Sequence, residues 1–222
     1  RVLFRSMAVH EGQILLGVAS GVVKLEAAGT DASRVVALDS PMIETWDMLS
    51  ADGELLAAGS EGVHRLDYAA DTGELLDAER LIADHYAYRL TRSRDRPVVY
   101  AELESGLGLM VKQDGRWADG GRVEGIDERV YHVAEGPDGR VWVGSVQGRF
   151  YVMQWQDDAL TVVARLGAEE GVPEGYAWPF VLGEDRNARL VLGTFDGGYR
   201  PVLNEAGDVV GVEPDPSFDN ES

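Results

Sequence analysis

Histidine is the side chain most often used as a general base or a metal ligand near neutral pH, and this chain has four: His10, His64, His85 and His132. None of them has a partner at the spacing of a metal motif such as His-x-x-x-His or His-Glu-x-x-His. The chain also lacks a Gly-x-Ser-x-Gly elbow, a phosphate-binding loop and an Asp-x-Asp-x-Asp-Gly calcium loop. We therefore predict no catalytic residue, no metal site and no cofactor, and a chain that is not an enzyme.

Neighbouring carboxylates could also perform acid and base chemistry, and they occur as Glu169-Glu170, Asp157-Asp158 and Glu184-Asp185. Adjacent residues on a strand point to opposite faces, and a chain with 39 acidic residues contains such pairs by chance. A solvated surface is the prediction for these pairs. His132 with Glu128 or Glu135 is the one combination that would suit an enzyme.

Aromatic and polar residues recur seven to twelve positions ahead of a short Gly-containing motif that occurs five times. Flat rings with a few charged groups beside them favour flat, partly apolar ligands, either a small molecule or an oligosaccharide. Aromatic residues of this kind also fill cores, because alternate residues of a strand point into the packing. The predicted ligand-binding residues are Trp46, His85, Tyr86, Arg89, His132, Tyr176 and Trp178.

The Gly-containing motif shows which elements must position these residues. Its copies begin at positions 12, 53, 96, 139 and 188, so the repeat length is 41 to 49 residues. Four short strands per blade of a β-propeller need roughly 40 to 50 residues. The units contain apolar runs of four to six residues punctuated by Asp-Gly or Gly-Ser, and no 11-residue stretch has helical periodicity.

The fourth unit illustrates the predicted blade, with strands at 130–134, 141–145, 150–153 and 160–164. The predicted fold is all-β, a β-propeller of four-stranded antiparallel blades. Five blades are visible, and they either close into a ring or form part of a larger propeller of about seven. We predict one propeller over 1–212, blades at about 1–38, 41–83, 84–124, 126–166 and 175–212, and an acidic tail or linker at 213–222. In this fold the predicted ligand-binding residues would surround one mouth of the central channel.

The composition of the chain limits the classes of partner that it can bind. The net charge of −19 opposes binding to nucleic acid or to anionic lipid, because such partners require a basic surface. No apolar stretch is long enough to span a bilayer, so we predict no membrane contact by this segment. The chain has no Cys, which excludes disulfides and thiolate metal sites. It also has no signal-peptide pattern, and the compartment stays open at this point.

Two units resemble a known family. Residues 135–145 (EGPDGRVWVGS) and 183–200 (GEDRNARLVLGTFDGGYR) resemble the two-component regulator propeller repeat, in which an acidic residue, a turn and Gly precede an apolar-Trp-apolar-Gly-Thr run. The segment Gly171-Val-Pro-Glu-Gly175 resembles the lead-in loop of that repeat. The resemblance implies a periplasmic or extracellular sensor domain, with C-terminal signalling parts of a two-component or diguanylate cyclase receptor beyond this segment.

Three functions follow as alternatives. A ligand-sensing or recognition propeller is the first, a protein–protein interaction scaffold the second, and a propeller enzyme resembling streptogramin lyase or a glycoside-processing enzyme the third. The acidic surface would favour a basic partner for a scaffold, whereas an enzyme would need the His132 pair.

Overall fold

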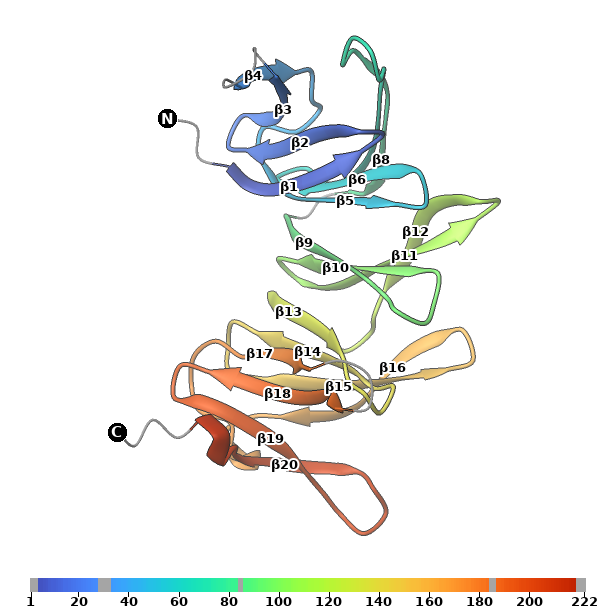
Figure 1. Cartoon of the computed structure of the whole chain (residues 1–222). Coiled ribbons are helices and arrows are strands. Elements are labelled where there is room, and N and C mark those ends of the chain that lie inside the picture. Colours follow the sequence, from blue (N-terminus) through green and yellow to red (C-terminus); the bar gives the residue numbers. More distant parts are fainter. Residues whose placement is uncertain (1–3, 28–32, 84–85, 184–186, 219–222) are drawn as a thin grey trace. The chain divides into compact units, whose positions relative to one another are not determined.

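The structure, a computed structural model, describes residues 4–27, 33–83, 86–183 and 187–218 of the chain. Within this part the regular structure consists of β-strands and short 3-10 helices, and it holds no helix long and apolar enough to cross a membrane. The strands form five separate four-stranded sheets, each antiparallel with its strands in sequence order (Figure 1). The predicted all-β blades are confirmed.

Two compact units divide the sheets, and blades one to three lie mainly in residues 1–104 and 108–121. Blade one contains β1 (Phe4–His10), β2 (Gln13–Val18), β3 (Gly21–Ala27) and β4 (Ser33–Leu38). Blade two contains β5 (Thr45–Ala51), β6 (Glu54–Gly59), β7 (Gly62–Tyr68) and β8 (Leu75–Ile82). Blade three contains β9 (Ala87–Arg92), β10 (Val98–Leu103), β11 (Gly106–Gln113) and β12 (Arg116–Arg122).

The second unit, residues 105–107 and 122–222, holds blades four and five. Blade four contains β13 (Val130–Glu135), β14 (Val141–Ser145), β15 (Phe150–Gln156) and β16 (Ala159–Leu166), followed by the 3-10 helix η1 (Ala168–Glu170). Blade five contains β17 (Trp178–Leu182), β18 (Arg189–Thr194), β19 (Gly197–Leu203) and β20 (Val209–Pro214), followed by η3 (Pro216–Phe218). The sequence interpretation placed 213–222 in a tail, whereas β20 continues to Pro214 and the Phe218 ring packs edge-on against Phe180.

Tight Asp-Gly turns join the first two strands of blade two and the last two of blade three. Asp52 and Gly53 have φ of 51° and 79°, and Asp114 and Gly115 have φ of 51° and 81°. Positive φ at both central positions is the turn geometry that matches the twist of paired strands, and Asp-Gly tolerates it. These local signals are the reason that the strand boundaries could be predicted from the sequence.

Within each unit, consecutive blades bury apolar side chains between their faces. We call the face toward the next blade in sequence the front face and the opposite one the back face. Ala8, Leu15 and Val22 on the front face of blade one pack with Met48, Leu55, Ala57 and Leu66 on the back face of blade two. Similar clusters join blade two to three and blade four to five. The core is thus a series of sheet-on-sheet layers.

A glycine in the second strand permits one of these close approaches. A Cβ at Gly144 would collide with the backbone carbonyl of Ala177, which lies just before β17. At Gly17 a Cβ would lie 3.0 Å from a Thr45 side-chain carbon and 3.1 Å from the Thr45 carbonyl oxygen. The predicted packing role is confirmed at these two positions. At Gly193 the missing side chain is instead replaced by the Trp178 indole of the same blade.

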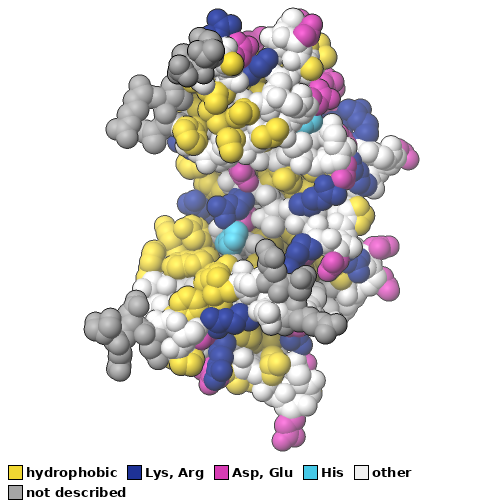
Figure 2. All heavy atoms as spheres, in the orientation of Figure 1, with side chains coloured by type: hydrophobic (Ala, Val, Ile, Leu, Met, Phe, Trp, Pro, Cys, Tyr) yellow, Lys and Arg dark blue, Asp and Glu magenta, His cyan; other side chains and the backbone are white. Residues whose placement is uncertain are grey.

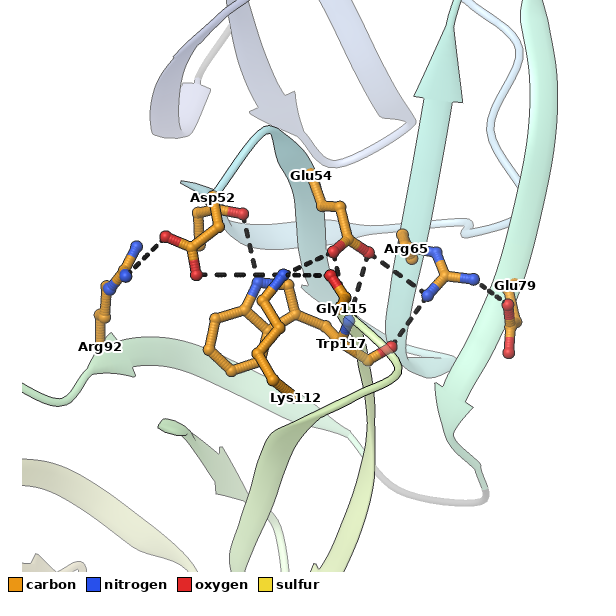
Figure 3. Close-up of polar contacts among 9 residues, drawn as sticks. Asp52, Glu54, Arg65, Glu79, Arg92, Lys112, Gly115 and Trp117 are labelled. Carbon is orange, nitrogen blue, oxygen red and sulfur yellow. Dashed lines mark hydrogen bonds and ion pairs between the residues drawn. The ribbon is translucent and has the colours of Figure 1, made fainter. Parts of the chain in front are cut away.

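Blades two and three are also joined by a polar network (Figure 3). Buried Arg65 of β7 pairs with Glu54 at 3.3 Å and with Glu79, and donates a 2.8 Å hydrogen bond to the Trp117 carbonyl. Lys112 binds Glu54 at 2.7 Å. The fully buried Trp117 donates its indole N–H to the Ala51 carbonyl at 3.1 Å. The Trp117 indole and the charged side chains of this network each contact a residue of another strand. The network therefore serves as a structural joint between the two blades.

Candidate functional site

The inner strands of blades one to four share a β-bulge. In blade two Thr45 pairs with Gly59 and Asp47 pairs with Ala58, so that Trp46 is an extra residue between them. The same register shift makes Arg5, Tyr88 and Tyr131 the extra residues of blades one, three and four. A bulge re-aims a side chain away from the regular alternation, and bulges are frequent beside binding sites. Three of the four re-aimed residues are aromatic and the fourth is an arginine.

Three of the bulge residues, Arg5, Trp46 and Tyr88, lie in the first unit. Together with Glu44 and Tyr86 they form what we call the first aromatic cluster. The Arg5 guanidinium lies 3.6 Å from the centroid of the Trp46 ring and pairs with Glu44 at 3.4 Å. Trp46 meets Tyr88 edge to face at 5.4 Å, and Tyr88 stacks on Tyr86 at 6.3 Å. Arginine over an indole face is a favourable cation–π contact, so the cluster is held together by its own side chains.

Asp47, which follows the bulge, fixes this strand to the next blade. Its carboxylate accepts hydrogen bonds from the backbone N–H of Met48 and of Leu90 in β9, both at 2.9 Å. Burial raises the pKa of the Asp47 carboxyl above its usual range, although both backbone donors oppose the shift. The position of Trp46 relative to blade three therefore rests on a hydrogen-bonded carboxylate.

In the second unit the bulged Tyr131 lies in the second aromatic cluster, which consists of Tyr131, Tyr176, Trp178 and Phe195. Ring centroids are 5.0 Å apart for Tyr131 and Tyr176, 6.1 Å for Tyr131 and Trp178, and 5.6 Å for Trp178 and Phe195. Phe195 is 70% exposed, and Tyr131 and Tyr176 are about two-fifths exposed. Figure 2 shows hydrophobic side chains gathered on the surface over β13 and β17. Four contacting rings, of which Tyr131, Tyr176 and Phe195 are exposed and Trp178 is half-buried, form a platform on which a flat molecule can stack.

The predicted ligand-binding residues are distributed over both clusters. Trp46 and Tyr86 belong to the first cluster, and Tyr176 and Trp178 belong to the second. Arg89 is exposed on β9 and His132 is half-buried on β13. His85 lies outside the described residues. The expectation that all seven surround one channel mouth stays a prediction.

Sequence reasoning did not select Arg5, Tyr88, Tyr131 and Phe195. The first three are the extra residues of bulges, and a strict alternation of faces assigns such positions to the wrong side. Phe195 is in the turn before Gly197, within the repeat motif, and its ring lies 3.1 Å from the place where a Cβ of Gly175 would be. An aromatic residue in the turn of the motif was the available signal for Phe195.

Glu128, one of the acids considered for an enzyme, has other partners. It is buried, receives a hydrogen bond from Tyr151 Oη and pairs with Arg149 at 3.1 Å. Burial, followed by the hydrogen bond to Glu128, raises the pKa of Tyr151 to about 12. Within the part of the chain that the structure describes, no three His, Asp or Glu side chains gather as a metal site would require. The described side chains of the candidate site can therefore stack on a ligand and form hydrogen bonds with it.

Comparison with known proteins supports the architecture. No protein-family model and no curated protein matches the sequence. The propeller of Dos1 superimposes with a TM-score of 0.61 at 15% identity, over 89% of this chain and 55% of that one. The fold is that of a β-propeller. At this level of identity the likeness establishes the propeller fold alone.

Two other matching structures carry functional names. The extracellular domain of a hybrid two-component system from B. thetaiotaomicron matches with a TM-score of 0.65 and 12% identity, over 98% of this chain and 27% of that domain. A protein from Bacteroides uniformis named as a 6-phosphogluconolactonase has a TM-score of 0.62 and 13% identity, over 95% of this chain and 71% of that one. The first match agrees with the resemblance to the two-component regulator propeller repeat. This chain spans about a quarter of the length of that sensor domain.

Proposed function

We propose that this propeller is a recognition module that senses a ligand through the second aromatic cluster. The observation that carries the proposal is the contact of four rings from blades four and five, with Phe195 and Tyr176 open to solvent. Large exposed apolar groups are costly unless they serve binding. The bulge at Tyr131 is not needed for strand pairing, because Tyr131 is an extra residue opposite β14; its effect is to re-aim the ring.

Ring stacking and net charge together define the ligand class. The apolar face of a sugar ring or another flat metabolite gains contact area on tyrosine and tryptophan, while its hydroxyl groups bond to polar neighbours. A net charge of −19 repels polyanions, including nucleic acids. An uncharged or weakly charged oligosaccharide satisfies both conditions.

We also propose that the module belongs to an extracytoplasmic receptor of the two-component or diguanylate cyclase type. Support comes from the repeat motif in blades four and five and from the similarity to extracellular domains of one- and two-component systems. The output of such a receptor would depend on parts that lie outside these 222 residues. Ligand recognition can be tested without those parts.

The test is a thermal-shift screen of the purified chain against oligosaccharides and small metabolites. A ligand at a hundred times its dissociation constant should stabilise the fold by about 2.7 kcal/mol, which at about 2–4 °C per kcal/mol raises Tm by roughly 5–10 °C. We expect Phe195→Ala and Tyr176→Ala each to raise Kd by roughly tenfold and so to reduce this shift by about half, while leaving the Tm without ligand nearly unchanged because both side chains are exposed.

The matched control is Trp155→Ala, which removes a half-buried aromatic residue of blade four outside the second aromatic cluster. This variant should keep the full ligand-dependent shift. A ligand whose stabilisation is undiminished in Phe195→Ala and Tyr176→Ala would place recognition elsewhere. If only a basic protein partner stabilised the chain, the scaffold function would replace the sensing function.

A further inference from the structure

Blade one carries an apolar surface on its back face. The directly paired positions of this antiparallel sheet put eight apolar side chains on this one face. They are Met7, Val9, Ile14, Leu16, Val23, Leu25, Val35 and Ala37. Met7 is 62% exposed, Val9 61% and Val35 44%, whereas Leu16 and Val23 at the centre of the face are buried. Figure 2 shows hydrophobic side chains spread over β1 and β2.

The opposite face of the same sheet is already used. Leu15 and Val22 on the front face are 1% exposed because they pack against blade two. A sheet with one face in water normally alternates apolar and polar residues, whereas a sheet buried on both faces is apolar on both. Blade one therefore has the sequence of an interior blade, yet five of the eight apolar side chains on its back face are exposed.

Blade two shows what covers such a face. The two blades have the same register, since Met7 pairs with Leu16 as Met48 pairs with Ala57. Likewise Ile14 pairs with Leu25 as Leu55 pairs with Leu66. In blade two, Met48 is 5% exposed and Leu55 is fully buried, because the front face of blade one packs on them. The exposed Met7 and Ile14 of blade one thus occupy positions that blade two uses to pack against its predecessor.

We infer that the back face of blade one packs against a further four-stranded antiparallel blade that lies outside residues 1–222. The partner surface should be a front face of small and branched apolar residues, like Ala8, Leu15 and Val22, which fits between these side chains. This interaction surface is separate from the proposed ligand site, and neither inference depends on the other.

Head-to-tail association of two copies through blade five is disfavoured. Part of the front face of blade five is covered by its own chain, because a Cβ at Gly198 would lie 2.6 Å from the Phe218 ring and Val191 is fully buried. Arg189 pairs with Asp215 and bonds Ser217 at 2.7 Å, which fixes η3 in this place. Among the described residues, η3 consequently occupies part of the front face that blade one of a second copy would need.

Residues 1–222 contain no Cys, so an introduced cysteine is the single thiol of this segment, and peptide mapping identifies the labelled position in both proteins. Met7→Cys is prepared both in residues 1–222 and in the product of the complete gene. Leu76→Cys, at a position 60% exposed on β8, is the matched control in both. We expect the thiol at position 7 to react with a maleimide at least about tenfold more slowly in the complete product, since labelling then requires local opening. The thiol at position 76 should react equally in both.

A photo-crosslinker on the same cysteine identifies the occupant. The inference predicts a crosslink to a segment outside residues 1–222 that carries the strand-turn pattern of a blade. Equal labelling of position 7 in both proteins would overturn it, because nothing would then cover the face. Protection that appears in residues 1–222 only at high protein concentration would also overturn it, since a second copy would be the occupant.

Discussion

Charged residues in this acidic chain differ greatly in how much they contribute to the stability of the fold, depending on how deeply they are buried. The Arg65 side chain is 7% exposed and bonds to Glu54, Glu79 and the Trp117 carbonyl. The Arg34 side chain is 68% exposed and pairs with Glu26 at 2.7 Å. Removal of a buried cation leaves its partners buried and unpaired, whereas removal of an exposed cation leaves a partner that water can solvate.

Arg65→Ala should lower the free energy of unfolding by about 3 kcal/mol or more, because Glu54 and the Trp117 carbonyl lose a buried partner. Arg34→Ala should cost less than about 1 kcal/mol. Urea unfolding of both variants at pH 7 measures the difference. Equal effects would show that the blade two–three network is not a structural joint.

His64 introduces a pH dependence. It is 4% exposed, its Nδ1 is buried without a hydrogen-bond partner, and burial, followed by the charge of Arg80, lowers its pKa below the usual 6.5. The unfolded chain therefore binds a proton at a higher pH than the folded chain. Stability from this residue is constant above about pH 6.5 and is lost as the pH falls toward the folded-state pKa.

Thermal unfolding at pH 7.5 and 5.5 tests this, with His64→Leu as the reference that cannot titrate. The original chain should lose more stability on acidification than His64→Leu does. The comparison between the two chains cancels the effect of the other acidic groups. An identical pH dependence would mean that His64 is protonated in the folded state without cost.

Among the elements, the second strand of a blade depends on a small residue for the approach of the next blade. Gly144→Ala should cost about 1–3 kcal/mol, because the new methyl group meets the Ala177 backbone, which cannot move without shifting β17. Gly167→Ala is the matched control, since only a Glu170 oxygen at 3.9 Å would neighbour its Cβ. Differential scanning calorimetry of both variants decides whether the close approach sets the packing. A Tm for Gly144→Ala equal to that of Gly167→Ala would contradict it.

The strands themselves were predictable from sequence. The fourth unit was predicted at 130–134, 141–145, 150–153 and 160–164, and β13 to β16 contain these ranges. Apolar runs bounded by Asp-Gly turns are local signals that need no knowledge of the tertiary structure. The bulges were not predictable, because an extra residue such as Tyr131 leaves the local sequence pattern unchanged. For this reason Trp178 was predicted from the sequence as a ligand-binding residue and Tyr131 was not.

For the whole molecule, the propeller fold accounts for the separation of packing from recognition. Apolar faces between blades supply the core, as Trp142 and Leu192 do between blades four and five. The inner-strand bulges and the turn at Phe195 supply exposed rings beside that core. Binding residues on loops and strand ends can vary while the sheets that position them remain constant.

The most direct test of this account is calorimetric titration of the ligand that stabilises the chain most, with the original chain, Phe195→Ala and Trp155→Ala compared. Loss of one stacked ring, worth about 0.5–1.5 kcal/mol beyond the contact area it buries, should raise Kd by roughly tenfold in Phe195→Ala. Trp155→Ala should leave Kd unchanged. A Kd that is the same in Phe195→Ala as in the original chain would contradict recognition at the second aromatic cluster.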